Sequence, residues 1–321
     1  MATSRHIIIG DIHGCADALS ELLRECRRTP TDTLISVGDL VDRGPDPAAV
    51  VRFFMEDDNA LAILGNHEDK HVRVHAGELP PGSNQLVTQL QMGEFYAEAL
   101  RWFATLPTCH TVLDHFVCHA GVDWQHPLDA QPRNALLRGK VRSRASVESG
   151  HKEPLDWLSD HPSWTADYRG DTPVVYGHYS TDAVREHNNT IGLDTGAGGG
   201  KELTGAPRLT ALILPERVFV SVPASDSVAG DVIANRRDEY EALKARHAEA
   251  QSRRRPKKAA PRTKAAPMLV DGVELNGRWL METHGFAAGP ELGQALTRLK
   301  QAFEAGDLAT LADVAQILTD P

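Results

Sequence analysis

Residues 34–44 read Leu-Ile-Ser-Val-Gly-Asp-Leu-Val-Asp-Arg-Gly, and this stretch decides the predicted fold. A short apolar run ends at Val37, and a glycine and three charged side chains follow it closely. This order predicts a buried strand that delivers Asp39, Asp42 and Arg43 at its carboxyl end. Open α/β sheets bind their ligands at that edge, so the stretch is a candidate functional site.

The same arrangement recurs elsewhere in the chain. Four more short apolar runs end in polar residues, and helical patterns separate the first three strands. The resulting β-α-β-α-β order predicts a mainly parallel sheet that is covered by helices. Because the carboxyl ends of parallel strands meet at one edge, we expect the polar residues to converge there. They are Asp11 and His13, Asn66 and His67, His119, and His178.

Six of these side chains form a set of oxygen and nitrogen donors without sulfur. Such a set suits manganese, iron or zinc better than calcium. Six ligands exceed the number that one tetrahedral site uses, but they fit two metals that share one bridging carboxylate. Two metals about 3.5–4 Å apart can activate a water molecule and hold a phosphoryl group. The six candidates are Asp11, His13, Asp39, Asn66, His119 and His178.

These motifs resemble the signature of the calcineurin-like metallophosphoesterases, and within them of the PPP phosphatase branch. The pattern GD-x-HG, GD-x-VDRG and GNHE, followed by two later histidines, is matched within residues 5–223. The resemblance implies an α/β/β/α sandwich with mainly parallel central strands. It also implies two divalent metals, manganese first among the candidates. Asp11 and His13 would bind the first metal, Asn66, His119 and His178 the second, and Asp39 would bridge them.

The resemblance further assigns proton transfer and phosphate binding. His67 would be the general acid, oriented by Asp42, and Arg43 would bind phosphate oxygens. An imidazole suits proton transfer near neutral pH, and a guanidinium fork matches phosphate. A hydroxide held between the metals would attack phosphorus, with no covalent intermediate. A second arginine often binds phosphate in this family, and the candidates are Arg138, Arg142 and Arg144.

Several substrate classes are compatible with these motifs. The main prediction is a bacterial PPP-type protein serine/threonine phosphatase, because Leu64 and Ala120 depart from the eukaryotic phosphatases. The His-Ala-Gly form at residues 119–121 is more similar to bacterial members, including the symmetrical diadenosine tetraphosphatases. A bis(5'-nucleosyl)-tetraphosphatase is therefore an alternative, although those enzymes more often carry Asp where this chain has Glu68. Further alternatives are an RNA-end phosphatase or phosphodiesterase, and an RNA-binding adapter that uses the fold as a scaffold.

Charge is unevenly distributed along the chain. The 321 residues carry a net charge of −10, which argues against a generally basic nucleic-acid binder. Residues 252–267 nevertheless hold seven basic side chains and three prolines, so they predict an exposed linker. The predicted parts are a catalytic domain at 1–224, an exit helix at 225–251, this basic linker, and a small helical module at 268–321.

The predicted module is similar to the C-terminal segment of bacterial CCA-adding and poly(A) polymerase-type nucleotidyltransferases. The similarity covers Gly277-Arg-Trp-Leu-Met-Glu-Thr-His-Gly285 and the two-helix pattern after it. It implies contact with RNA through residues 252–321, in which the basic linker would attract phosphates. The module's acidic charge favours the alternative of a docking or oligomerisation module. The sequence makes no prediction of the oligomeric state.

The compartment is predicted from cysteines and hydropathy. The four cysteines form no C-x-x-C pair and no dense framework, which is typical of a reducing compartment. No apolar run approaches the roughly 20 residues of a membrane-spanning helix. We therefore expect a cytoplasmic protein without a signal peptide or membrane anchor.

Overall fold

The structure is a computed structural model that describes residues 5–149, 163–199, 205–254, 268–287 and 289–319. Its contacts divide the chain into two compact units, Met1–Arg254 and Arg255–Pro321, and each is described by itself. Within the described ranges, no helix combines the length and the apolar character that crossing a membrane requires.

The first sheet of the larger unit has the strand order β10-β9-β1-β2-β3. Strands β1 to β3 pair in parallel, whereas β9 and β10 form an antiparallel hairpin at one edge. The chain crosses between the parallel strands through α1 (Ala16–Glu25) and α2 (Pro47–Glu56), as the β-α-β-α-β pattern predicted. The strands are β1 (His6–Ile9), β2 (Thr33–Ser36), β3 (Ala60–Ala62), β9 (Arg208–Leu214) and β10 (Val218–Pro223).

The second sheet has the strand order β4-β5-β6-β8-β7, and its three central strands are parallel. Between β5 and β6 the chain forms η2 (Leu128–Ala130), α6 (Arg133–Arg138), α7 (Arg144–Ser149) and α8 (Ser163–Asp167). The strands are β4 (Cys109–Val112), β5 (His115–Cys118), β6 (Val174–Tyr176), β7 (Arg185–His187) and β8 (Thr190–Gly192).

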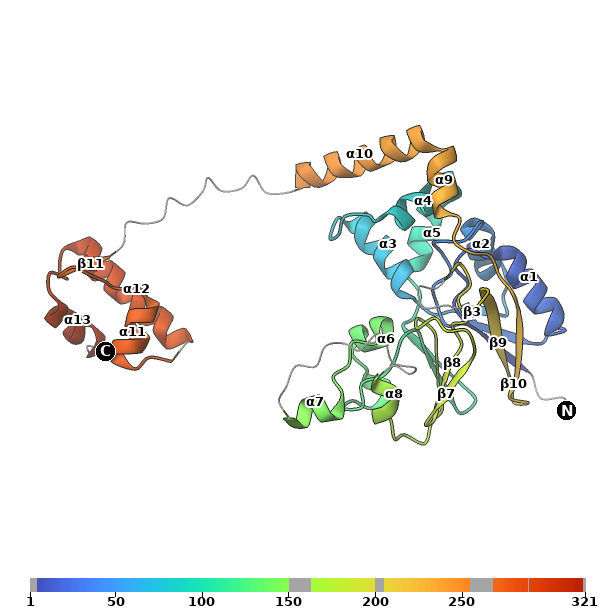
Figure 1. Ribbon diagram of the computed structural model, residues 1–321, viewed down its shortest axis with the longest axis horizontal. Helices are drawn as coiled ribbons and strands as arrows, with labels where there is room; N and C mark the ends of the chain where they lie inside the picture. The colour runs from blue at the N-terminus through green and yellow to red at the C-terminus, as the bar shows by residue number, and fades with distance from the viewer. Residues whose placement is uncertain (1–4, 150–162, 200–204, 255–267, 288, 320–321) are drawn as a thin grey trace. The chain divides into compact units, whose positions relative to one another are not determined.

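Alternating side chains on these strands build the core in layers. Ile7 and Ile9 pack against the helices that cover the first sheet, while Ile8 points to the other face. There Ile8 shares an apolar cluster with Val117 and Val175 of the second sheet. The sequence neighbours of Val117 and Val175 pack on the opposite side, toward α6 and α8. The larger unit is thus the α/β/β/α sandwich that the resemblance implied (Figure 1).

Helices α3 (Asn66–Ala76), α4 (Ser83–Met92) and α5 (Tyr96–Phe103) follow β3, with the short η1 (Gly93–Phe95) between the last two. The segment predicted as one exit helix forms two helices instead, α9 (Ala229–Asn235) and α10 (Arg237–Arg254). Both pack on α4 before the chain leaves this unit. They pack there because an apolar face that includes Tyr240 and Leu243 of α10 is buried against Leu86 and Val87 of α4.

The smaller unit contains a short hairpin and three helices. Its core is apolar and includes Leu280, Leu299 and Val314. Residues 255–267, most of the predicted basic linker, lie outside the described residues, so RNA contact through 252–321 stays a prediction. The hairpin and the first helix were not predicted, whereas the two later helices were. The elements are β11 (Leu269–Val270), β12 (Val273–Glu274), α11 (Gly277–His284), α12 (Pro290–Ala305) and α13 (Leu311–Thr319).

Candidate metal centre and catalytic site

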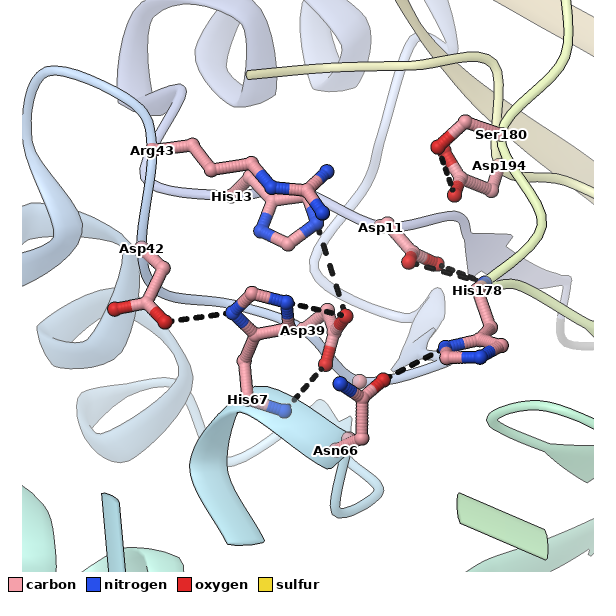
Figure 2. A network of polar contacts seen from close by, with 12 residues as sticks. Asp11, His13, Asp39, Asp42, Arg43, Asn66, His67, His178, Ser180 and Asp194 are labelled. Atoms are coloured by element: carbon pink, nitrogen blue, oxygen red, sulfur yellow. Dashed lines mark hydrogen bonds and ion pairs between the residues drawn. The ribbon is translucent and has the colours of Figure 1, made fainter. Parts of the chain in front are cut away.

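Asp39 lies at the centre of the site, after the end of β2. Its carboxylate Oδ2 is 3.7 Å from His13 Nε2 and 3.8 Å from His67 Nε2, and its Oδ1 is 3.4 Å from His119 Nε2. The separations from His13 and His67 are too long for hydrogen bonds. Two ligand atoms that bind the same metal at about 2.1 Å lie roughly 3–3.5 Å from each other or slightly further. The distances from Asp39 to the three imidazoles are therefore compatible with metals that Asp39 shares with them. Figure 2 shows His13 and His67 facing this buried carboxylate, and His119 is the third imidazole near it.

The second group of predicted ligands meets at the ends of β5 and β6. Asn66 Oδ1 lies 2.7 Å from His119 Nε2 and 2.7 Å from His178 Nδ1. Two clusters of candidate metal ligands result: His13, Asp39 and His67, and Asp39, His119 and His178. Asp39 belongs to both, as the predicted bridging role requires. The structure also brings His67, which was predicted as the acid, into the first cluster.

Asp11 completes the convergence from the end of β1. Its two carboxylate oxygens accept the backbone N–H of His178, at 3.0 and 3.1 Å. A Cβ atom on Gly177 would lie 1.9 Å from Asp11 Oδ1, so only glycine allows this approach. Burial raises the pKa of Asp11, and the nearby carboxylates of Asp194 and Asp39 raise it further. A buried carboxylate that is crowded by negative charge is well placed to receive a cation.

The backbone is strained at the same positions. Residues other than glycine rarely adopt positive φ angles, and such strain collects at functional sites. Ten described non-glycine residues have a positive φ, and half of them are predicted site residues. They are His13 (46°), Asp39 (53°), Asp42 (72°), Arg43 (69°) and His178 (70°).

His67 and Asp42 form a hydrogen-bonded pair. His67 Nδ1 lies 2.6 Å from Asp42 Oδ2, and Asp42 is wholly buried. Burial disfavours the imidazolium form of His67, but the carboxylates of Asp39 and Asp42 outweigh this and raise its pKa. A raised pKa favours the protonated imidazole, which is the state that a proton donor needs. The geometry therefore suits the predicted general acid.

The arginines differ in their surroundings. Arg43 extends over His13 in Figure 2 and donates a hydrogen bond to the carbonyl of Gly199 at 3.3 Å. Arg138 of α6 forms an ion pair with Asp69 of α3, the helix that begins at Asn66. Arg144 instead stacks on the ring of Trp124, 4.2 Å from its centroid, and the carbonyl of Arg142 accepts the Trp124 indole N–H. Of the three candidates, Arg138 is thus held by an ion pair against the helix that carries Asn66.

Glu68 is a site residue that the sequence analysis did not assign to the site. Its buried carboxylate accepts the backbone N–H groups of Asp39 and Gly65, at 2.9 and 3.0 Å. It also accepts those of Leu40 and Val41, at 2.8 and 3.2 Å. Burial and the neighbouring Asp39 raise the pKa of Glu68 to about 7. One side chain therefore holds together the two loops that present Asp39 and Asn66. Its position in the GNHE motif, directly after Asn66 and His67, was the sequence signal that could have identified it.

Asp194 is another residue near the site that the sequence did not single out. Asp194 is buried, accepts the Ser180 hydroxyl at 2.7 Å and accepts the Gly196 N–H at 2.9 Å. Figure 2 shows it on the Asp11 side of the site. Burial raises its pKa. Only the tertiary fold connects it with Asp11.

The donor chemistry fits two divalent metals. The converging groups are carboxylates, imidazoles and one carboxamide, which suit borderline transition metals. Cys15 and Cys118 lie next to predicted ligands, but burial raises the pKa of both thiols and keeps them protonated. A protonated thiol is a poor metal ligand, so sulfur does not change the character of the site.

Comparisons with known proteins agree with this geometry. Residues 4–209 match the family model for calcineurin-like phosphoesterases. The asymmetrical bis(5'-nucleosyl)-tetraphosphatase PrpE of Halalkalibacterium halodurans is 30% identical over 253 residues, which cover 71% of this chain and 97% of that protein. The PrpE protein of Bacillus mycoides is 29% identical over 255 residues, with coverages of 69% and 95%.

A solved structure provisionally named as a diadenosine tetraphosphatase is also similar. Its TM-score is 0.52 at 28% identity, and the match covers 70% of this chain and 96% of that one. The two curated relatives are named for asymmetrical cleavage, whereas the sequence motifs suggested the symmetrical type. The names of these relatives favour the dinucleotide alternative over the main prediction of a protein phosphatase.

Proposed function

Because the chain belongs to the calcineurin-like phosphoesterase family, we propose that this metal-dependent phosphoester hydrolase is a bis(5'-nucleosyl)-tetraphosphatase. One observation carries the proposal: relatives with that activity in their names match this chain over 95–97% of their own length. Cleavage is expected to be asymmetrical, as in those names. The protein serine/threonine phosphatase is the second candidate, and it is supported by the PPP-type motifs.

The ligand set supports two manganese ions as the resident metals. Asp11 and His13 would hold the first, and Asp39 would bridge the pair. When bound, the metals polarise a phosphoryl oxygen and lower the pKa of a coordinated water. The remaining ligands, which would hold the second metal, are Asn66, His119 and His178.

The other residues of the chain have separate roles in this proposal. Arg43 binds phosphoryl oxygens of the substrate and orients the scissile bond. His67 delivers a proton from Nε2 to the leaving oxygen, while Asp42 accepts a hydrogen bond from Nδ1–H and fixes the ring. Arg138 is the proposed second phosphate-binding arginine, because Asp69 holds its guanidinium beside α3.

The first experiment measures hydrolysis by chelator-stripped protein with and without added manganese. One panel contains diadenosine tetraphosphate, a phosphopeptide and a 3'-phosphorylated RNA oligonucleotide. We expect manganese-dependent turnover of the dinucleotide. Asymmetrical cleavage would yield one nucleoside triphosphate and one monophosphate, and symmetrical cleavage would yield two diphosphates. Faster release from the phosphopeptide or the RNA would transfer the assignment to that substrate class.

Two substitutions test the assigned roles. His67→Ala is expected to lower turnover about 100- to 10,000-fold while metal content is kept, because a general acid contributes that much. Asp39→Ala is expected to lose both metal and turnover. Metal content is measured by elemental analysis of the purified variants. Equal metal content with unchanged turnover in both variants would overturn the assignment.

A further inference from the structure

The carboxylate of Asp42 receives more hydrogen bonds than pairing with His67 requires. His67 Nδ1 and Gln85 Nε2 both lie 2.6 Å from its Oδ2. His71 Nε2 lies 2.9 Å and the Thr88 hydroxyl 2.7 Å from its Oδ1. A carboxylate offers about four lone-pair sites, and these four groups occupy them. The plane of the Asp42 carboxylate therefore cannot rotate without breaking a hydrogen bond.

The supporting side chains are themselves held in one orientation. The Tyr96 hydroxyl lies 2.9 Å from His71 Nδ1, so the other ring nitrogen of His71 is free to donate to Asp42. Gln85 Oε1 accepts the backbone N–H of Gly82 at 3.0 Å, which turns the amide N–H toward Asp42. His71 and Gln85 thus each have a second partner that selects their orientation.

Helix α4, which carries Gln85 and Thr88, is fixed from its other side. The Tyr240 hydroxyl lies 3.2 Å from the Ser83 hydroxyl, and Arg236 donates to the carbonyl of Leu90 at 2.8 Å. An apolar cluster between α4 and α9–α10 supports these contacts. The helix therefore has little freedom to move relative to Asp42.

We propose that Gln85 and Thr88 are positioning residues for His67, acting through Asp42. The proposal rests on the proposed role of His67 as proton donor. In that step the oxygen of the attacking water forms a new bond to phosphorus, the P–O bond to the leaving oxygen breaks, and the leaving oxygen takes the proton from His67 Nε2. The neutral imidazole keeps its Nδ1–H on Asp42. Thr88 and Gln85 hold the carboxylate where that hydrogen bond aims Nε2 at the leaving oxygen.

Thr88→Val tests the proposal because it removes one hydroxyl and conserves the side-chain shape. We expect kcat for the preferred substrate to fall about 10-fold, a fraction of the full contribution of a general acid, with KM and metal content nearly unchanged. Thr88→Ser, which keeps the hydroxyl, should restore kcat. Thr190→Val is the matched control. This buried threonine is the first residue of β8, and its hydroxyl donates to the carbonyl of His187 in β7. Gln85→Leu is a second variant that should act in the same direction as Thr88→Val.

A spectroscopic measurement separates this proposal from the assigned substrate. Proton NMR of the full chain should contain a far-downfield imidazole N–H signal from His67, identified by its loss in His67→Ala. In Thr88→Val this signal should shift or exchange faster with water, and in Thr88→Ser and Thr190→Val it should be retained. If the signal behaves in this way but the substrate panel is silent, the positioning network stands and the proposed function fails. An unchanged signal and unchanged kcat in Thr88→Val would overturn the positioning role.

Discussion

The two units of the chain bury different kinds of side chain. The larger unit buries charged and polar groups around its site, among them Asp39, Asp42 and Glu68. Across the described residues of the smaller unit, every buried side chain is apolar, as at Leu280 and Leu299. A buried charge lowers stability unless partners compensate for it, whereas a buried leucine stabilises the fold directly. The larger unit therefore holds its candidate site within its interior, whereas the described interior of the smaller unit is an apolar core.

Backbone strain follows the same division. Among the described residues other than glycine that have a positive φ, half are predicted site residues of the larger unit. In the described part of the smaller unit the corresponding residue is Asp271, in the turn between β11 and β12. A tight hairpin turn requires a positive φ to reverse the chain, whereas the loops that carry the predicted site residues have no such requirement. Substitutions in the two units should consequently change different observables.

A pair of glycine substitutions should give the largest contrast. In Gly177→Ala the new Cβ would overlap Asp11, so we expect a loss of metal and a fall in kcat/KM of about 100-fold or more. Gly293 lies inside α12, and nothing lies within 4 Å of a Cβ built there. Gly293→Ala should leave turnover unchanged and stabilise the protein by roughly 0.5–1 kcal/mol. Steady-state kinetics and urea unfolding measure the two effects, and normal activity in Gly177→Ala would contradict the ligand role of Asp11.

Glu68→Gln should have the next largest effect. The amide keeps the size of the side chain but turns one oxygen into a donor that faces backbone N–H groups. We expect a loss of about 10- to 100-fold in metal affinity, as for other residues that support metal ligands. Manganese titration followed by turnover measures this. The prediction fails if the variant binds manganese as tightly as the unmodified chain.

Leu280→Ala should affect stability without affecting chemistry. Leu280 is wholly buried in the smaller unit, so the cavity should cost about 2–5 kcal/mol of that unit's stability. Turnover by the larger unit should remain within about twofold, because the proposed site contains no residue of the smaller unit. Denaturant unfolding monitored by Trp279 fluorescence, beside the same core, reports the loss. A parallel loss of kcat would show that the comparison between the units is too simple.

The smallest effect is expected for an ion pair of the larger unit away from the site. Arg5 donates to the Asp32 carboxylate from Nε at 3.1 Å and from Nη2 at 2.6 Å. Burial alone would raise the pKa of Asp32, but the hydrogen bonds from Arg5 and from the Thr29 N–H outweigh it and lower the pKa. The folded-state pKa therefore lies below the unfolded value of about 4, and the stabilisation is present above that pH.

Asp32→Asn tests this sign. The substitution should lower the free energy of unfolding by about 1 kcal/mol at pH 7. That difference should shrink as the pH falls below about 4, because the unmodified carboxyl then takes up a proton in both states. Urea unfolding at a series of pH values measures it. A difference that grows toward acid would be inconsistent with a lowered pKa.

Much of the site was predictable because its signals are local. Asp11, Asp39 and Asn66 each stand just after a strand, and strand-end motifs of this kind are readable in a few consecutive residues. Parallel pairing then requires those ends to meet at one edge. Periodicity likewise predicted α12 and α13. The same logic overlooked α11 and mistook α9 and α10 for one helix, because neighbouring elements rather than local pattern set those boundaries.

The sequence by itself predicted the candidate ligands, the alternation of strands and helices, and the chemical class. These depend on which residue types follow each apolar run, and such spacing survives in any fold that pairs the strands in parallel. Only the tertiary structure decided which side chains hold those ligands in place. Thr88 and Gln85 meet Asp42 across more than 40 residues of chain, and Asp194 lies near Asp11 although they are far apart in sequence. A hydrogen bond between distant segments has no sequence period, so packing alone reveals it.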